Sequence, residues 1–215
     1  MAEYVPALRF RSLTALYDPV ARWVTRETRF KPALLEAAKI RAGHQVLDVG
    51  CGTGTLAIEA AERTPGAKIV GLDADREILD RAVQKAGDSN VQVQFDEALA
   101  TDLPYENESF DRVLSTLFFH HLTTPEKRRT AVEIHRVLKA RGELHVVDFD
   151  RAQDPLMWLA FSAVRGFDGF ERTRVNAAGK LGEVFQDAGL VVREGRRRFR
   201  TAFGTVGQFT ATKAS

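Results

Sequence analysis

Hydrophobic and polar positions follow two alternating periods along the chain, which predicts a repeating order of strands and helices. Short apolar or β-branched runs predict strands, and apolar residues three and four positions apart predict helices. Strands are predicted at 44–50, 68–74, 91–95, 110–118 and 143–149; LVVREG and RRRFRTAF, then TVGQFTATK, predict two final strands. Helices are predicted at 55–63 and 75–87, from Thr124-Pro125 onward, and over most of 154–188. Strands joined by helical crossovers predict a parallel, doubly wound α/β sheet.

The first forty residues have a helical pattern. Five residues share three- and four-residue spacing: Leu13, Leu16, Tyr17, Val20 and Val24. Asp18-Pro19 predicts a break into two helices, because Asp is a good N-cap and Pro suits the first helical position. Another helix is expected after Pro32, ending near Gly43.

Composition limits the class of protein. A chain of 215 residues is long enough for one domain with a substantial core. The 31 basic residues nearly balance the 29 acidic ones, so the net charge of +2 carries no nucleic-acid signature. The single cysteine excludes an internal disulfide and fits a reducing compartment. The N-terminus lacks a signal-peptide run, and the apolar stretch 156–164 is too short to span a bilayer, so we expect a cytoplasmic protein.

The stretch VLDVGCGTG (46–54) ends the first predicted strand and leads into a helix. Ligands of parallel sheets bind at the carboxyl ends of the strands, and glycines allow a sharp turn and a close approach to the ligand. The N–H groups at the start of the following helix face such a ligand. Thr53 or Thr55 is a candidate cap for that helix or a ligand contact. The alternative is a glycine-rich turn that binds nothing.

Glycine spacing and two aspartates favour a nucleoside with an amino-acid tail over a dinucleotide. The loop reads G-x-G-x-G, and Thr55 stands where the third glycine of G-x-G-x-x-G would fall. Asp48 suits a ligand ammonium group and would repel a pyrophosphate. Asp73, at the end of the second strand, is placed to accept hydrogen bonds from ribose hydroxyls. Asp73 could instead be the N-cap of the next helix, but Asp75 suits that role better.

Four blocks in order, VLDVGCGTG, GLDAD, LPYENESFDRVLST…HHL and RVLKARGELHVVDF, resemble class I S-adenosylmethionine-dependent methyltransferases. Within that family they are most similar to the ubiquinone/menaquinone C-methyltransferase group. The resemblance covers roughly 40–150 with specific motifs. It implies a Rossmann-like sheet of seven strands, mostly parallel with the last antiparallel, helices on both faces, and N-terminal cap helices. It divides one domain into a cap (1–40), a cofactor-binding core (41–150), a substrate-covering insert (151–188) and C-terminal strands (189–215).

The same resemblance implies the cofactor, S-adenosyl-L-methionine, with S-adenosyl-L-homocysteine as its product. The positions implied to bind it are Asp48, Gly50, Cys51, Gly52, Thr53, Gly54, Asp73, Ala74, Leu99, Ala100 and Thr116. Asp73 would bind the ribose, and Ala74, Leu99 and Ala100 would border the adenine. Leu99 departs from the family, which often has an acid there. Asp96 or Asp102 could supply that acid from a shifted position.

Candidate catalytic groups follow the later strands. His120 and His121 come after the fourth strand, and Asp148 closes the fifth. Either histidine could act as a general base, and either could instead orient the loop or pack on the cofactor. The resemblance implies that Tyr17 folds over the cofactor. We expect no metal site, because adjacent histidines on a strand point apart. Cys51 is interpreted as a packing residue, and His135 and His145 as structural.

Two further segments bear on the acceptor and the partners. Aromatic residues in MWLAFSAVRGFDGF (157–170) suggest an apolar or ring-containing acceptor, or ordinary helix packing. The arginines of REGRRRFR (193–200) suggest the solvated side of an edge strand, or a peripheral membrane contact. We expect a small-molecule acceptor, no nucleic acid, no stable membrane insertion, and a monomer or homodimer. An NAD-dependent oxidoreductase and a non-catalytic binding protein are the alternatives.

Overall fold

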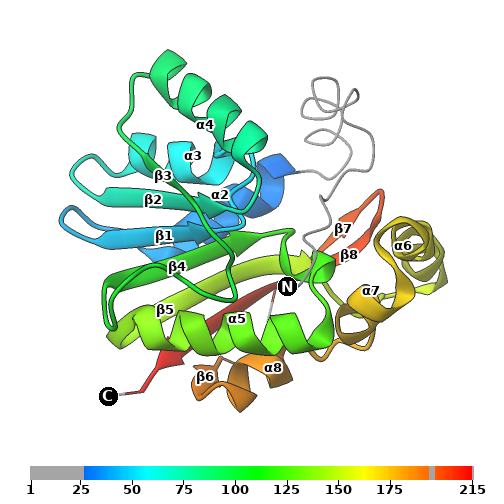
Figure 1. Ribbon diagram of the computed structural model, residues 1–215. Coiled ribbons are helices and arrows are strands. Elements are labelled where there is room, and N and C mark those ends of the chain that lie inside the picture. The colour runs from blue at the N-terminus through cyan, green and yellow to red at the C-terminus, as the bar shows by residue number, and fades with distance from the viewer. Residues whose placement is uncertain (1–26, 194–196, 215) are drawn as a thin grey trace.

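Eight strands form one twisted sheet in the computed structural model, which describes residues 27–193 and 197–214 (Figure 1). The strands are β1 (Gln45–Val49), β2 (Lys68–Asp73), β3 (Gln94–Glu97), β4 (Phe110–Thr116), β5 (Leu138–Phe149), β6 (Leu190–Val192), β7 (Arg197–Thr201) and β8 (Gly204–Lys213). Their order is β3-β2-β1-β4-β5-β8-β6, with β7 also paired to β8. The five strands from β3 to β5 pair in parallel, whereas β8 is antiparallel to β5, β6 and β7.

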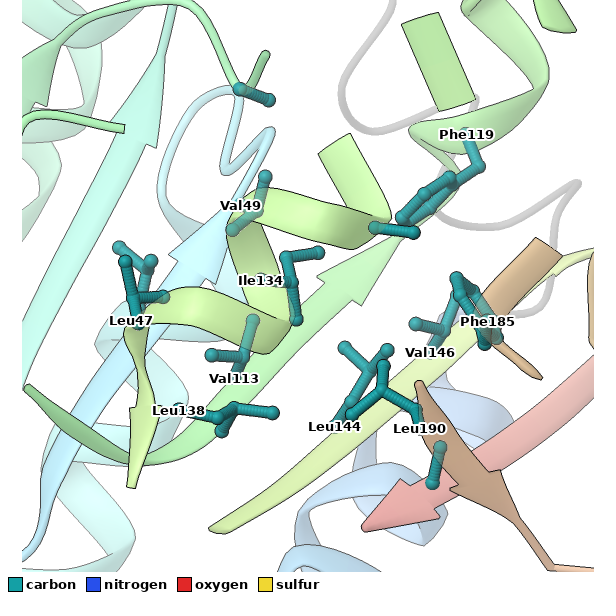
Figure 2. Packing of buried hydrophobic residues seen from close by; sticks show 14 of the residues in the cluster. Leu47, Val49, Val113, Phe119, Ile134, Leu138, Leu144, Val146, Phe185 and Leu190 are labelled. Carbon is teal, nitrogen blue, oxygen red and sulfur yellow. The ribbon is translucent and has the colours of Figure 1, made fainter. Parts of the chain in front are cut away.

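Helices cover both faces of the sheet. They are α2 (Glu27–Ala38), α3 (Thr55–Arg63), α4 (Arg76–Asp88), the 3-10 helix η1 (Phe119–His121), α5 (Thr124–Val137), α6 (Pro155–Asp168), α7 (Phe170–Ala177) and α8 (Leu181–Asp187). Helices α5 and α8 pack on one face, where Ile134 and Phe185 meet the strands (Figure 2). Helices α2, α3 and α6 pack on the other face.

Two cores explain the unbroken apolar runs of the central strands. In β1, Val46 belongs to the core under α2 and α3, whereas the next residue, Leu47, belongs to the core under α5. Successive side chains of a strand point to opposite faces, so a strand covered on both sides is apolar at every position. The predicted doubly wound α/β fold is confirmed.

Most helix boundaries agree with the sequence. Helix α3 spans the predicted 55–63, and Asp75 caps α4 by accepting hydrogen bonds from the N–H groups of Glu77 and Ile78. Helix α5 begins at Thr124 as expected, with Thr123 and Glu126 forming a capping box before it. The segment 154–188 consists mainly of the three helices α6, α7 and α8.

Several boundaries were predicted wrongly: β4 ends at Thr116 rather than residue 118, and α2 ends at Ala38 rather than near Gly43. Strand β3 begins at Gln94 rather than residue 91, because its pairing with β2 begins there. Helix α2 begins before Pro32 and includes it; buried Phe30 and Leu34 anchor the helix despite the hydrogen bond that proline cannot donate. Strand β5 begins at Leu138 rather than residue 143, with a break in its register against β4.

The C-terminal segment forms one strand more than predicted. The two short strands β6 and β7 both pair with β8, β6 along residues 211–213 and β7 along residues 204–208. The ten residues of β8 are enough to pair with both strands, so the sheet has eight strands rather than seven.

The predicted helices around Asp18-Pro19, with Tyr17, lie outside the described residues. No helix in the described part of the chain is long and apolar enough to cross a membrane.

Candidate cofactor and acceptor site

The loop from Gly50 to Gly54 joins β1 to α3 at the carboxyl edge of the sheet. Gly50, Gly52 and Gly54 have φ values of 68°, 54° and 71°, a left-handed conformation that favours glycine. A Cβ on Gly50 would overlap the ring of Phe118 and lie 2.8 Å from its Cβ. A Cβ on Gly52 would meet no described atom within 4 Å. Gly50 is therefore required by packing, whereas Gly52 borders space that the described residues leave open.

Strand β2 holds this loop in place. The N–H groups of Gly50 and Cys51 donate to the carbonyl oxygen of Leu72, at 2.8 and 3.0 Å. The N–H of Gly52 donates to Asp73 Oδ2 at 2.9 Å, and the N–H of Asp75 donates to Asp73 Oδ1 at 3.1 Å. Burial raises the pKa of the Asp73 carboxyl, and these two N–H groups partly oppose that shift. A carboxylate can accept about four hydrogen bonds, so Asp73 retains capacity for ligand hydroxyls.

Asp48 is buried beneath the loop, with only 1% of its surface exposed. Neither carboxylate oxygen has a hydrogen-bond partner among the described residues. Burial raises the pKa of Asp48 to about 7, the positive charge of Lys31 lowers it, and the negative charge of Asp73 raises it further. A buried carboxylate without a hydrogen-bond partner is unfavourable, even with the charge of Lys31 to offset part of the cost. A ligand ammonium group would supply the missing partner.

Cys51 and the threonines of the loop have no capping or nucleophilic role in this structure. Burial and the charges of Asp48 and Asp73 raise the pKa of the Cys51 thiol well above its usual value, so it stays protonated. No described side chain caps α3, whose N-cap is Gly54. The prediction that Thr53 or Thr55 caps this helix is therefore wrong; Thr55 Oγ1 accepts a hydrogen bond from Lys85 instead.

The predicted adenine side lies where β3 runs into the next loop. The N–H of Ala98 donates to the carbonyl oxygen of Asp73 at 3.1 Å, which joins the loop that carries Leu99 and Ala100 to the end of β2. Leu99 is 48% exposed and Ala100 is buried, so Leu99 presents an apolar surface to solvent or ligand.

Tyr105 is a further residue near this side that the sequence did not single out. Its hydroxyl donates to Asp96 Oδ2 at 2.9 Å, so Asp96 is already engaged, whereas Asp102 is exposed. Burial and Asp96 raise the pKa of the Tyr105 phenol. Arg136 on α5 fixes this loop by donating to the carbonyl oxygens of Tyr105 and Leu103, at 2.7 and 2.9 Å.

The end of β4 brings the predicted catalytic loop onto the glycine loop. Thr116 ends the strand, half-buried, and Leu117 then adopts a φ of 51°. This turn is the one that lays the Phe118 ring against Gly50. The two histidines of η1 follow directly.

A buried hydrogen bond joins His120 to Asp148 at the end of β5. His120 Nδ1 lies 2.9 Å from Asp148 Oδ1, and the side chains are 5% and 0% exposed. Asp148 Oδ1 also accepts hydrogen bonds from the N–H of Phe149 at 2.7 Å and from Asn176 Nδ2 at 3.2 Å. Burial would raise the pKa of Asp148, but His120 and Lys127 bring it below its usual value. In a neutral imidazole, an ionised Asp148 favours the Nδ1–H tautomer, which leaves the ring's lone pair on Nε2.

Lys127 connects the loop after η1 to α7. This side chain is fully buried, and its Nζ donates to the carbonyl oxygen of Leu122 and, at 2.7 Å, to that of Arg172. Burial lowers the pKa of Lys127 to about 8, although Asp148 raises it. Neither Lys127 nor Asn176 carried a recognisable sequence signal, because each acts through the packing of distant elements.

His121 lies beside His120, contrary to the predicted geometry. The two rings have centroids 4.0 Å apart, because the residues lie on a 3-10 helix and not on a strand. Asp168, the last residue of α6, lies 3.4 Å from His121 Nδ1 and 3.7 Å from His120 Nε2. Asp168 was not identified from the sequence, and its carboxylate lies within 4 Å of a ring nitrogen of each histidine, whereas Asp148 pairs with His120. The expectation that these histidines point apart is wrong.

The aromatic insert divides into two sets. Phe161 is buried and stacks on Phe149 with ring centroids 4.5 Å apart, and Phe149 in turn packs edge-on against His120. Trp158 and Phe167 are exposed. Only the first set therefore packs in the stack of rings that contacts His120.

The remaining predicted residues fall away from the site. His145 is buried in β5 against Glu143, and His135 lies on α5 beside Gly189. The arginines of β7 lie on an edge strand, where Arg198 and Arg200 pair with Asp150 and Asp154.

Comparison with known proteins identifies the family. Residues 46–142 match the family model of the methyltransferase domain. An uncharacterized methyltransferase of Synechocystis sp. is 33% identical over 166 residues, which are 77% of this chain and 76% of the relative. The chain belongs to the S-adenosylmethionine-dependent methyltransferases. A demethylmenaquinone methyltransferase of Lactobacillus johnsonii is 29% identical over 183 residues, 83% of this chain and 72% of the relative.

Solved structures confirm the class I methyltransferase fold. A SAM-dependent methyltransferase from Aquifex aeolicus superposes with a TM-score of 0.70 at 19% identity, covering 97% of this chain and 99% of that one. A phosphoethanolamine N-methyltransferase of Haemonchus contortus, in complex with phosphomonomethylethanolamine and S-adenosylhomocysteine, gives a TM-score of 0.75 at 16% identity. It covers 95% of this chain and 59% of that one.

The described residues of this methyltransferase fit the family's cofactor, S-adenosylmethionine. The buried, unpartnered carboxylate of Asp48 matches a positively charged amino group, and Gly52 leaves its side of the loop open. The methyltransferase names of these relatives also favour the enzyme over an NAD-dependent oxidoreductase.

Proposed function

We propose that this methyltransferase transfers a methyl group to a small apolar or aromatic acceptor, with a quinol or related phenol as the leading class. The observation that carries the proposal is the His120–Asp148 pair, which lies two residues beyond the contact between Phe118 and the cofactor loop. The rings of Phe118, Phe149 and Phe161 surround this region with apolar surface. The relative named demethylmenaquinone methyltransferase supports a ring-containing acceptor.

We assign cofactor binding to the edge of β1, β2 and β3. Asp48 would hold the amino group of the methionine moiety, with Gly50, Cys51, Gly52, Thr53 and Gly54 forming the backbone around it. Asp73 would accept hydrogen bonds from the ribose hydroxyls, using the capacity that Gly52 and Asp75 leave. Ala74, Leu99 and Ala100 would border the adenine, and Thr116 would line the side toward the acceptor.

The chain contributes positioning and a proton acceptor. When bound, S-adenosylmethionine supplies an electrophilic methyl group on a sulfonium. The contact of Phe118 with Gly50 sets the distance between cofactor loop and acceptor loop, and such positioning contributes much of the rate enhancement in a displacement. Asp148 holds the proton of His120 on Nδ1, so Nε2 can take the proton that an acceptor hydroxyl loses.

The insert of residues 151–188 is proposed to cover the acceptor. Its helices supply Asp168, beside both histidines, and Asn176, beside Asp148. Phe161 stacks on Phe149, which ties α6 to the end of β5. We also propose that this insert is one of four parts of a single domain. The other three are a cap (1–40), a cofactor-binding core (41–150) and C-terminal strands (189–215).

The test is transfer of an isotope-labelled methyl group from S-adenosylmethionine to a panel of acceptors. The panel contains a short-chain reduced demethylmenaquinone, simple phenols and catechols, and phosphoethanolamine. We expect product with the quinol or the phenols and none with phosphoethanolamine. Asp73→Ala serves as the cofactor-deficient control. Methylation of phosphoethanolamine alone would contradict the proposed acceptor class, and S-adenosylhomocysteine binding without turnover of any acceptor would contradict the proposed catalysis.

A further inference from the structure

Two histidines and one carboxylate converge beside α6. His120 and His121 come from η1, and Asp168 comes from the end of α6. One ligand atom of each lies within 4.8 Å of the others. We propose that these three residues bind one divalent transition-metal ion, with Zn²⁺ as the probe that best suits them.

The distances are close to the ligand spacing of such a site, so small side-chain movements would complete it. Asp168 Oδ2 lies 3.7 Å from His120 Nε2, Asp168 Oδ1 lies 3.4 Å from His121 Nδ1, and one ligand atom of each residue lies within 4.8 Å of the others. Ligands bound to zinc at about 2.0–2.1 Å in a tetrahedron are roughly 3.3 Å apart. Two imidazoles and a carboxylate suit Zn²⁺ and other first-row ions, whereas Mg²⁺ and Ca²⁺ prefer oxygen ligands alone. Three protein ligands leave a fourth position open, as in catalytic rather than structural zinc sites.

The surroundings of His120 supply the second shell that metal-binding histidines need. A ligating histidine almost always donates its other ring N–H to a carboxylate or carbonyl oxygen, which fixes the ring and the tautomer. His120 Nδ1 lies 2.9 Å from Asp148 Oδ1, which leaves Nε2 for the ion. Asn176 and the N–H of Phe149 hold that carboxylate in turn. The His121 side chain is 31% exposed, so an ion can enter from solvent.

The ion would join two parts of the fold. The histidines lie beyond β4, and Asp168 lies at the end of the helix that opens the insert. A ligand that binds only the folded arrangement stabilises it in proportion to the logarithm of its concentration over Kd. Zinc would therefore stabilise the docking of α6 on the core.

Zinc would also act on the proposed chemistry, and this consequence rests on the proposed function. The lone pair of His120 Nε2 can form a bond to the ion or take a proton from the acceptor, but not both. Bound zinc should therefore inhibit transfer to an acceptor that must lose a proton, without weakening the binding of S-adenosylhomocysteine at the cofactor loop.

The direct test is a titration of the chelator-stripped, full-length protein with Zn²⁺, using Co²⁺ absorption to report the coordination. We expect one ion per chain. His121→Ala and Asp168→Asn should each weaken zinc binding at least tenfold, and Asp148→Asn should weaken it about 10–100-fold through the second shell. His135→Ala is the matched control, because His135 lies beside Gly189 and away from the cluster.

Each variant is checked for folding by circular dichroism and by S-adenosylhomocysteine binding. These readouts keep the metal proposal separate from the proposed function, since neither depends on an acceptor. The metal proposal would be overturned by the absence of stoichiometric zinc binding to the folded protein, or by zinc binding that both His121→Ala and Asp168→Asn retain. Displacement of zinc by S-adenosylhomocysteine would place the ion at Asp48, Cys51 and Asp73 and would also overturn it.

Discussion

The ring of Phe118 occupies the space that a side chain on Gly50 would need. An ideal Cβ at Gly50 would overlap that ring and lie 2.8 Å from the Phe118 Cβ. The contact joins the loop after β1 to the loop after β4, and so joins the proposed cofactor and acceptor sides. The distance between the two sides thus depends on the absence of a side chain at one position.

Gly50→Ala should destabilise the protein more than Gly52→Ala. Both variants place alanine at a positive φ, which costs roughly 1–2 kcal/mol. Only Gly50→Ala adds a clash with Phe118, for which overpacking costs typically ~1–3 kcal/mol. Thermal and urea denaturation would measure the difference.

The partner of the clash can be tested directly. Phe118→Ala introduced into the Gly50→Ala protein should recover part of the lost stability, so the double variant should be more stable than the two single changes predict. Equal destabilisation by Gly50→Ala and Gly52→Ala, or strict additivity with Phe118→Ala, would show that this contact does not determine the loop.

Asp73→Ala should weaken S-adenosylhomocysteine binding more than tenfold. The substitution removes the acceptor proposed for the ribose hydroxyls and also the group that fixes the N–H of Gly52. Asp75→Ser is the matched control, because serine keeps the N-cap of α4 and leaves Asp73 in place. Calorimetric titration would measure both affinities. Unchanged affinity in Asp73→Ala would refute the ribose assignment.

Asp48→Asn should raise stability at alkaline pH and abolish tight S-adenosylhomocysteine binding. The native pKa of Asp48 is about 7, above its ordinary value of 3.8. Between these values the native state binds a proton that the unfolded state has lost, so stability falls as pH rises through this window. At pH 8 the charged, buried carboxylate costs on the order of 2–4 kcal/mol, which asparagine avoids.

The pH profile of ligand binding provides the second readout for Asp48. The native protein should bind S-adenosylhomocysteine more tightly as pH rises through about 7, because the ionised carboxylate pairs with the ligand ammonium group. The Asp48→Asn profile should be weak and flat over the same range. Two results together would contradict the raised pKa of Asp48. They are a ligand affinity of the native protein that does not change between pH 5 and pH 8, and a free energy of unfolding that does not fall over that range.

Asp148→Asn should lower kcat at least tenfold while leaving S-adenosylhomocysteine affinity unchanged. An asparagine amide can donate to His120 Nδ1, which reverses the tautomer and puts the proton on Nε2. Asn176→Ala should have a smaller effect, because the N–H of Phe149 still holds the carboxylate. Steady-state kinetics would separate kcat from KM. Equal losses of affinity and kcat would indicate a structural role instead.

Local patterns in the sequence were enough to predict the framework. The alternation of strands and helices, the bounds of α3, the Asp75 cap of α4 and the opening of α5 were all readable, because each depends on residues close in sequence. The first residues of β3 and β5 could not be predicted in this way, because a strand begins where its partner strand allows pairing. The extra strand β7 depended on the length of β8 in the same way.

The sequence by itself determined the sheet, the glycine loop and the two aspartates beside it, since these lie at the ends of successive strands. Only the tertiary structure decided how the acceptor side is built. It put His120 and His121 on a 3-10 helix, brought Asp168 from α6 and Asn176 from α7, and buried Asp48 without a hydrogen-bond partner. The reason is physical: side-chain direction and burial depend on packing between segments far apart in the chain, which no local period records.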